Sequence, residues 1–181
     1  MTSTECVVSV LLCAVLGGSS MFGQSQPRSN DTIIREVSFR LTLPGAWSSG
    51  PTDDPTKRTY HTKDEQLTVS IFGSLFGASG EMTHDDRAER FHTWVNKRRD
   101  VENKMPGFAD VVVSEPSFGE SQGTLAARYT GFDGARQRRF HCLVLASSSA
   151  FEIFYYEAVD MKESLVGDRA KAIFNSIDIP K

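Results

Sequence analysis

FHCLVLASSSAFEIFYYEA, residues 140–158, is the stretch of sequence that decides the fold. It spans parts of two runs rich in aliphatic and aromatic residues, 135–147 and 150–158, which predict two strands joined at Ser148 and Ser149. Both runs carry apolar side chains at odd and at even positions. Because neighbouring side chains of a strand point to opposite faces, a sheet built on these strands must be covered on both faces.

The residues before this stretch extend the same sheet. Residues 122–132 predict a further strand, and Asp133 followed by Gly134 predicts a two-residue type I′ hairpin turn between it and the next strand. The three strands are therefore expected to form an antiparallel meander. Shorter strands are expected at residues 36–43, 58–61, 67–72 and 109–115.

Two helices are expected to supply the covers. The first starts at the capping residue Thr83, runs to about Asn103 and has an apolar stripe of Ala88, Phe91, Trp94 and Val95. The second covers residues 160–174, and its apolar face is made by Leu165, Val166, Ala170, Ile173 and Phe174. The expected fold class is α+β, as a three-layer α/β/α sandwich with a central, mainly antiparallel sheet.

An apolar run near the start of the chain, residues 7–16, has the length of a signal-peptide core and is too short to span a bilayer. Small residues follow, so a signal peptide at 1–23 with cleavage near 20–23 is expected, then a linker at 24–32 and one domain at 33–181. The protein is accordingly predicted to be exported, either periplasmic or secreted. The run lacks the preceding basic residues of a typical signal peptide, and an N-terminal strand or core helix is the alternative.

The cysteines follow from this division of the chain. Cys6 and Cys13 fall in the leader, so Cys142 is the single thiol of the predicted domain and no internal disulfide is expected. His141 precedes Cys142 in a predicted strand, and strand neighbours point to opposite faces. The two residues are therefore not expected to form a catalytic pair, and Cys142 is predicted to be buried.

Composition and motifs argue against several function classes. The formal net charge is −3 and the pI is about 5.8, which does not suit a general nucleic-acid binder. The Gly-rich residues 73–80 lack the Gly-Lys-Ser/Thr ending of a phosphate-binding loop, and the sequence has no G-x-S-x-G nucleophile elbow. No catalytic residue, cofactor or metal is predicted, and the protein is not expected to be an enzyme.

Three motifs resemble those of a known family. They are Phe39-x-Leu41-x-Leu43-Pro44-Gly45-x-Trp47, then Tyr156-Glu157-Ala158, and last Ala170-x-x-Ile173-Phe174-x-Ser176-Ile177. Together with the order of elements over about residues 33–179, they resemble PsbP-like domains and their bacterial extracytoplasmic relatives of unknown function. The resemblance implies an α/β/α sandwich and an accessory, assembly or binding role. It transfers no binding residue, because its motifs are core and turn positions.

Two surface features are candidates for binding. The first is an arginine group of Arg128, Arg136, Arg138 and Arg139, whose planar guanidiniums suit a carboxylate or phosphate of a partner; the alternative is a solvated face balanced by nearby acids. The second is the loop tip of Leu75 and Phe76, which either docks on a partner or membrane or packs on the core. Apart from an uncleaved leader, this loop is the expected membrane contact.

The predicted function is a non-catalytic, extracytoplasmic accessory or binding protein with a protein partner in the cell envelope. The alternative is a small metal-dependent or hydrolytic enzyme that uses the helix face of His84, Glu89 and His92. The same helix face is otherwise a solvated surface. A purely structural envelope component is the third possibility.

Overall fold

The computed structural model describes residues 28–36, 39–72, 82–102, 112–121, 123–134, 137–147, 149–158 and 167–178. The predicted leader, the Leu75–Phe76 loop tip and Arg136 lie outside these residues. The elements in chain order are β1 (Thr32–Glu36), β2 (Phe39–Leu43), β3 (Ser48–Ser49), β4 (Lys57–His61), β5 (Gln66–Phe72), α1 (His84–Glu102), β6 (Val112–Val113), β7 (Ser117–Ser121), β8 (Thr124–Asp133), β9 (Arg138–Ala146), β10 (Ala150–Tyr156) and α2 (Asp168–Asn175).

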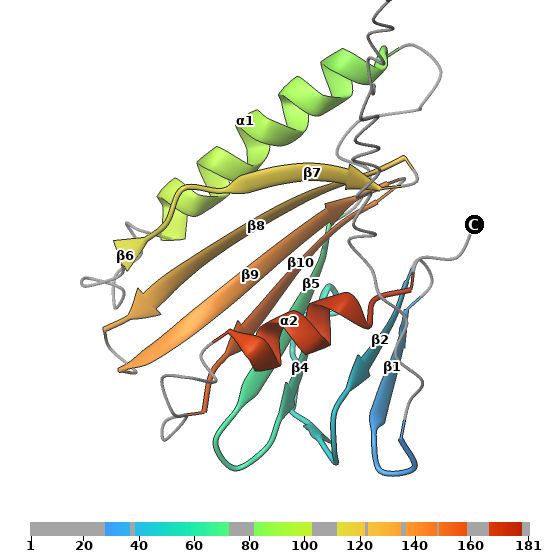
Figure 1. Cartoon of the computed structure of the whole chain (residues 1–181), viewed down its shortest axis with the longest axis vertical. Helices are drawn as coiled ribbons and strands as arrows, with labels where there is room; N and C mark the ends of the chain where they lie inside the picture. Colours follow the sequence, from blue (N-terminus) through green and yellow to red (C-terminus); the bar gives the residue numbers. More distant parts are fainter. Residues whose placement is uncertain are drawn as a thin grey trace, which may run out of the picture.

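One large antiparallel sheet organises these elements (Figure 1). Its order is β3-β4-β5-β10-β9-β8, and both β6 and β7 pair with β8 on the outer side. Every pair of neighbouring strands is antiparallel. The predicted α+β class, the mainly antiparallel sheet and the meander of the last three long strands are therefore confirmed.

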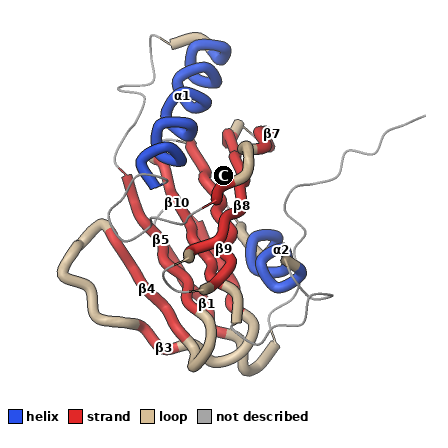
Figure 2. The backbone as a smooth tube through the Cα atoms, turned by 90° about the vertical axis from the view of Figure 1, so that its left-hand side faces the viewer, coloured by secondary structure: helices blue, strands red, loops and turns tan. Residues whose placement is uncertain are grey.

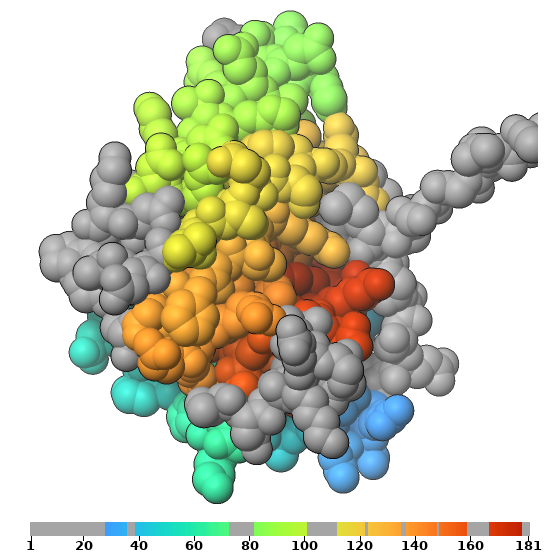
Figure 3. Space-filling model, turned by 60° about the vertical axis from the view of Figure 1, so that its left-hand side comes forward, coloured from blue at the N-terminus to red at the C-terminus, as the bar shows by residue number. Residues whose placement is uncertain are grey.

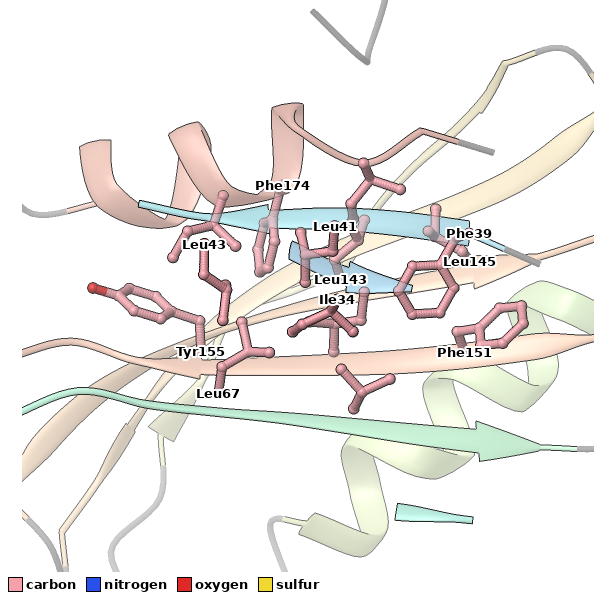
Figure 4. Close-up of a cluster of buried hydrophobic side chains, with 14 of the residues drawn as sticks. Ile34, Phe39, Leu41, Leu43, Leu67, Leu143, Leu145, Phe151, Tyr155 and Phe174 are labelled. Atoms are coloured by element: carbon pink, nitrogen blue, oxygen red, sulfur yellow. The ribbon is translucent and has the colours of Figure 1, made fainter. Parts of the chain in front are cut away.

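The two faces of the sheet carry separate cores, because alternate residues of the strands point to opposite sides. Leu143 and Leu145 of β9 join a core with Phe174 of α2 and the β1–β2 hairpin (Figure 4). Cys142 and Val144, the intervening residues, join a second core with the apolar stripe of α1. In Figure 2, strands of the sheet run between the two helices. The expectation that the central strands are buried on both faces is confirmed.

The prediction of a two-residue turn between β8 and β9 is wrong. Asp133 still pairs with Arg138, so the connection has four residues rather than two. Of the described residues in this connection, Gln137 adopts the left-handed conformation, with φ 52°, and Gly134 does not. The side-chain amide of Gln137 donates to the Gly134 carbonyl over 2.7 Å and closes the longer loop. The Asp-Gly pair does not form the predicted turn, because Asp133 is buried within the strand ladder rather than exposed in a turn.

The strand predicted at residues 36–43 is in fact the second half of a hairpin. Phe39, Leu41 and Leu43 of β2 are buried as predicted, and β1 pairs with β2 in a small sheet of its own. In β1, Ile34 is buried whereas its neighbour Ile33 is exposed, so this strand has little of the apolar alternation that predicts a strand from sequence. The hairpin does not pair with the large sheet, and its buried side chains attach it there by packing.

The sheet edge beside β8 is broken into two short strands. The strand expected at residues 109–115 is described only as Val112–Val113, and the second strand, Ser117–Ser121, was not predicted. Pro116 lies between them and has no N–H to donate to the ladder. Ser114 keeps the edge in register, since its N–H donates to the Thr130 carbonyl over 2.8 Å.

The described residues of the two predicted apolar faces are buried or partly buried, with Ala88 and Trp94 of α1 among the partly buried ones. α1 begins as predicted: the N–H of Asp86 donates to the Thr83 hydroxyl, which donates in turn to the Asp86 carboxylate. Phe91 and Val95 of α1 are fully buried, as are Ala170, Ile173 and Phe174 of α2. The first part of the second predicted helix, up to residue 166, lies outside the described residues. In the described part of the chain, the helices lack the length and apolar character needed to cross a membrane.

Candidate functional site

Strand register decides how the predicted arginines are placed. Arg138 and Arg139 open β9, opposite Asp133 and Phe132. Arg128 lies on the facing strand as predicted, but opposite Leu143, four residues further along β9. At roughly 3.3 Å per residue, that offset is about 13 Å. Arg138 and Arg139, as strand neighbours, point to opposite faces of the sheet, and Arg128 shares the face of Arg139 at a position further along the ladder. The structure therefore does not gather these three arginines into one group.

Side chains of β8 and β9 form a surface that we call the β8–β9 face. Its members lie on the same side of the sheet as α2, because they alternate along β8 and β9 with the residues of the α1 core. They are Arg128, Thr130, Phe132, Arg139 and His141. In Figure 1, α2 crosses β10 and β5, while the ends of β8 and β9 next to β6 extend past it. Figure 3 presents β6 to β9, in yellow and orange, beside α2 in red.

The outer end of this face exposes an aromatic ring next to a guanidinium. Phe132 is 39% exposed, and the Arg139 side chain directly opposite is 45% exposed. Val112 of β6 lies on the other side of Phe132 in the register and is 75% exposed. Exposed aromatic and arginine side chains are enriched where proteins bind one another. This end of the face therefore has the composition of a binding surface.

Next to Arg139, just past the end of β10, lies Glu157, a buried carboxylate from the Tyr156-Glu157-Ala158 motif whose N–H donates to the Arg139 carbonyl over 3.0 Å. One of its oxygens accepts hydrogen bonds from the Nε2 of His141 and from the N–H of Gly167, the residue before α2. The Arg139 guanidinium lies 4.0 Å from its second oxygen. Glu157 thus ties β9 to the start of α2 and holds the base of the face in place.

Arg138 is fixed by the same residue, although it points to the other side of the sheet from Arg139. Its Nε donates to the backbone carbonyl of Glu157 over 3.1 Å. Arg138 is therefore part of the scaffold, and Arg139 is the more accessible of the two guanidiniums.

Arg128 differs from Arg139 in its surroundings. It is half-buried on the inner part of the face, and this burial lowers the pKa of its guanidinium from the ordinary value.

A second polar cluster beneath α2 is built around Tyr155, which is fully buried. Its hydroxyl donates to Glu65 over 2.8 Å, and Arg169 of α2 donates to both oxygens of the same carboxylate. Burial, followed by the hydrogen bond to Glu65, raises the pKa of Tyr155 far above its ordinary value. Because the phenol stays neutral and the carboxylate is already paired, this cluster joins α2 to the sheet and has a structural role.

The side chains of the alternative metal site take other partners. His84 contacts Glu120 of β7 over 2.7 Å, and the ring of His92 stacks on Phe118 with centroids 3.9 Å apart. Glu89 is exposed on α1. Among the described residues, His, Cys, Asp and Glu side chains nowhere gather in a group of three suited to a metal ion. The structure therefore does not favour the alternative enzyme.

The His84–Glu120 contact predicts a pH effect. The hydrogen bond between His84 and Glu120 raises the pKa of His84 above 6.5, and the nearby Asp85 raises it to a lesser extent. A group whose pKa is higher in the folded state stabilises that state below the unfolded pKa, and the contribution is lost as pH rises through the folded pKa. The tie between α1 and β7 should therefore weaken from mildly acidic to alkaline pH.

An NMR titration of the imidazole resonances tests this expectation. Glu120→Gln should return the pKa of His84 towards 6.5, and Asp85→Asn should lower it by less, because Asp85 is the smaller cause. An unchanged His84 titration in Glu120→Gln would show that the contact does not exist in solution.

Comparison with known proteins gives a match at the level of structure. No family model matches the sequence, and no curated protein matches it. A similar solved structure is the solution structure of cyanobacterial PsbP (CyanoP) from Synechocystis sp. PCC 6803, with a TM-score of 0.54 and 14% identity over 87% of this chain and 98% of that chain. A crystal structure from Bacteroides thetaiotaomicron VPI-5482 has a TM-score of 0.38 and 11% identity, over 84% of this chain and 48% of that chain. The likeness to CyanoP, over nearly the whole of that protein, confirms the resemblance inferred from the sequence motifs: this chain has a PsbP-like fold.

Proposed function

We propose that this chain is a non-catalytic binding or accessory protein of the extracytoplasmic space, built as a three-layer α/β/α sandwich. The observation that carries the proposal is the exposed end of the β8–β9 face. There Phe132 and Arg139 stand side by side at the surface, and buried hydrogen bonds fix the strands beneath them. A rigid base with an exposed aromatic and arginine pair suits recognition of a partner.

A non-catalytic role agrees with how the described polar groups are used. Glu65 is paired with Arg169 and Tyr155, and Glu157 is paired with His141. Carboxylates in such contacts hold elements together. The buried Cys142 points away from His141, in agreement with the strand alternation, so these two neighbours do not supply a nucleophile and base.

The extracytoplasmic location is supported by two independent features. The apolar run at residues 7–16 has the length of a signal-peptide core. The fold is PsbP-like, and the sequence motifs resemble those of PsbP-like domains, whose bacterial relatives are extracytoplasmic. We therefore propose that the partner belongs to the cell envelope and that Arg128, which shares the face of Arg139, is a second binding residue.

A pull-down from the extracytoplasmic fraction of the native host tests the proposal. Arg139→Ser should reduce the amount of retained partner by about tenfold, because an exposed arginine at the centre of an interface contributes on the order of 1–2 kcal/mol. The melting temperature of the Arg139→Ser variant should change little, because Arg139 is largely exposed and its contact with Glu157 is long.

Arg90→Ser is the matched control, since Arg90 is an exposed arginine on α1, on the other side of the sheet. It removes the same charge and should retain the partner as the wild type does. Equal retention by wild type and Arg139→Ser, or equal losses in both variants, would contradict the proposal.

A further inference from the structure

Three side chains form a row across the outer end of the β8–β9 face. Val112 of β6 pairs with Phe132 of β8, and Phe132 pairs with Arg139 of β9, so all three point to the same side of the sheet. Neighbouring strands are about 4.8 Å apart, and the row is therefore roughly 10 Å long. It runs from an apolar residue through an aromatic ring to a guanidinium, and each of its members is exposed.

Of the carboxylates near this row, Glu157 lies 4.0 Å from the Arg139 guanidinium, and the others point away from the row. Glu157 is buried and already accepts hydrogen bonds from His141 and Gly167. Asp133 points to the other face of the sheet, since it pairs with Arg138.

Two further carboxylates lie on the neighbouring sheet edge, and both contact α1. Glu115 contacts Arg99, and Glu120 contacts His84. The exposed charge that the described residues present on this row is therefore the positive charge of Arg139.

We infer that the row takes a segment of a partner protein that carries an apolar side chain beside a carboxylate. The carboxylate pairs with the planar guanidinium of Arg139, which can donate two parallel hydrogen bonds. The apolar side chain covers Phe132 and Val112 and removes both from water. This inference rests on the proposed function, because it names the chemistry of the partner at the same face.

The row suits a peptide better than a membrane surface. Anionic membranes attract proteins through clusters of several Lys and Arg residues. The row offers one guanidinium next to two apolar side chains, which matches one acidic and one apolar residue in sequence.

Fluorescence anisotropy with labelled synthetic peptides tests the inference on the full chain. The first peptide carries a Glu-Leu pair between Gly and Ser residues, the second carries Gln-Leu, and the third carries Glu-Ser. The Glu-Leu peptide should bind with measurable affinity. Each of the other two should bind about tenfold more weakly, because each lacks one half of the recognition.

Protein variants locate the binding. Arg139→Gln should weaken binding of the Glu-Leu peptide about tenfold and leave the weaker binding of the Gln-Leu peptide unchanged. Phe132→Ser should weaken binding of the Glu-Leu peptide but leave binding of the Glu-Ser peptide unchanged. If Phe132→Ser does not fold, Val112→Ser takes its place in this test. Arg90→Gln is the control and should bind all three peptides as the wild type does.

Several outcomes overturn the inference. Equal affinity for the Glu-Leu and Gln-Leu peptides would remove the role of the carboxylate, and wild-type binding by Arg139→Gln would remove the role of Arg139. Binding to phosphatidylglycerol vesicles without binding to the peptide would assign the face to a membrane surface. If Arg139→Ser loses the native partner but no peptide binds, the proposed function stands and the partner chemistry is wrong. If neither the partner nor the peptides depend on Arg139, both are wrong.

Discussion

Replacing Arg98 by Ala is expected to lower the free energy of unfolding by about 3–5 kcal/mol. Glu152 lies in the middle of β10, is 1% exposed, and faces the α1 core. Arg98 of α1 donates from Nη2 to one carboxylate oxygen over 2.7 Å and from Nε to the other over 3.4 Å. Its guanidinium also lies over the ring of Phe72. Without Arg98, the carboxylate in the sheet loses this counter-charge, and burying a charge without one is costly.

Urea unfolding of the wild type, Arg98→Ala and the double variant Arg98→Met/Glu152→Leu provides the measurement. The double variant should recover most of the lost stability, because removing both charges removes the need to pair them. If Arg98→Ala stays within about 1 kcal/mol of the wild type, the pair resembles an exposed ion pair and is not the link between α1 and the sheet.

Replacing Phe39 by Ala is expected to cost about 3–5 kcal/mol, as for a large side chain removed from a core. Phe39 is fully buried, and its ring meets Phe151 of β10 edge to face with centroids 4.8 Å apart. The β1–β2 hairpin does not pair with the large sheet, so packing of this kind attaches it there. Polar ties also join β2 to residues after α2, through Arg40 with Asp178 and Thr42 with Ser176.

Calorimetry gives the stability change, and hydrogen exchange shows where it acts. In Phe39→Ala, the amides of β1 and β2 should exchange faster, while those at the centre of β9 keep more of their protection. Ile33→Ala is the control in the same hairpin, because Ile33 is 39% exposed, and it should cost no more than about 0.5 kcal/mol. Equal costs for the two variants would mean that the hairpin does not dock through its buried face.

The strongest patterns in the sequence predicted the main elements of the fold. β9 and β10 are apolar at both odd and even positions, and α1 has an apolar stripe with a capping residue at its start. β7 was missed because SFGES is polar and Gly-containing, and its strand conformation comes from pairing with β8 rather than from propensity. β1 was missed for a similar reason, since Ile34 is its one residue in the core cluster.

The site was predictable only in part, because it depends on register. The sequence showed that Arg128, Arg138 and Arg139 belong to facing strands, but the four-residue connection after Asp133 sets which residues are opposite. The exposure of Phe132 also follows from that register. In the sequence, Glu157 was identified only as part of the Tyr156-Glu157-Ala158 motif, with no binding role, because its contacts with His141 and Gly167 arise from tertiary structure.

An NMR titration of the labelled protein with the captured partner tests most directly our proposal that this PsbP-like domain binds a partner through the β8–β9 face. We predict that the largest backbone amide shifts occur in β8 and β9 near Phe132 and Arg139, and that Arg139→Ser removes them. Shifts concentrated in α1 or in the β3–β4 edge, with the β8–β9 face unchanged, would contradict it.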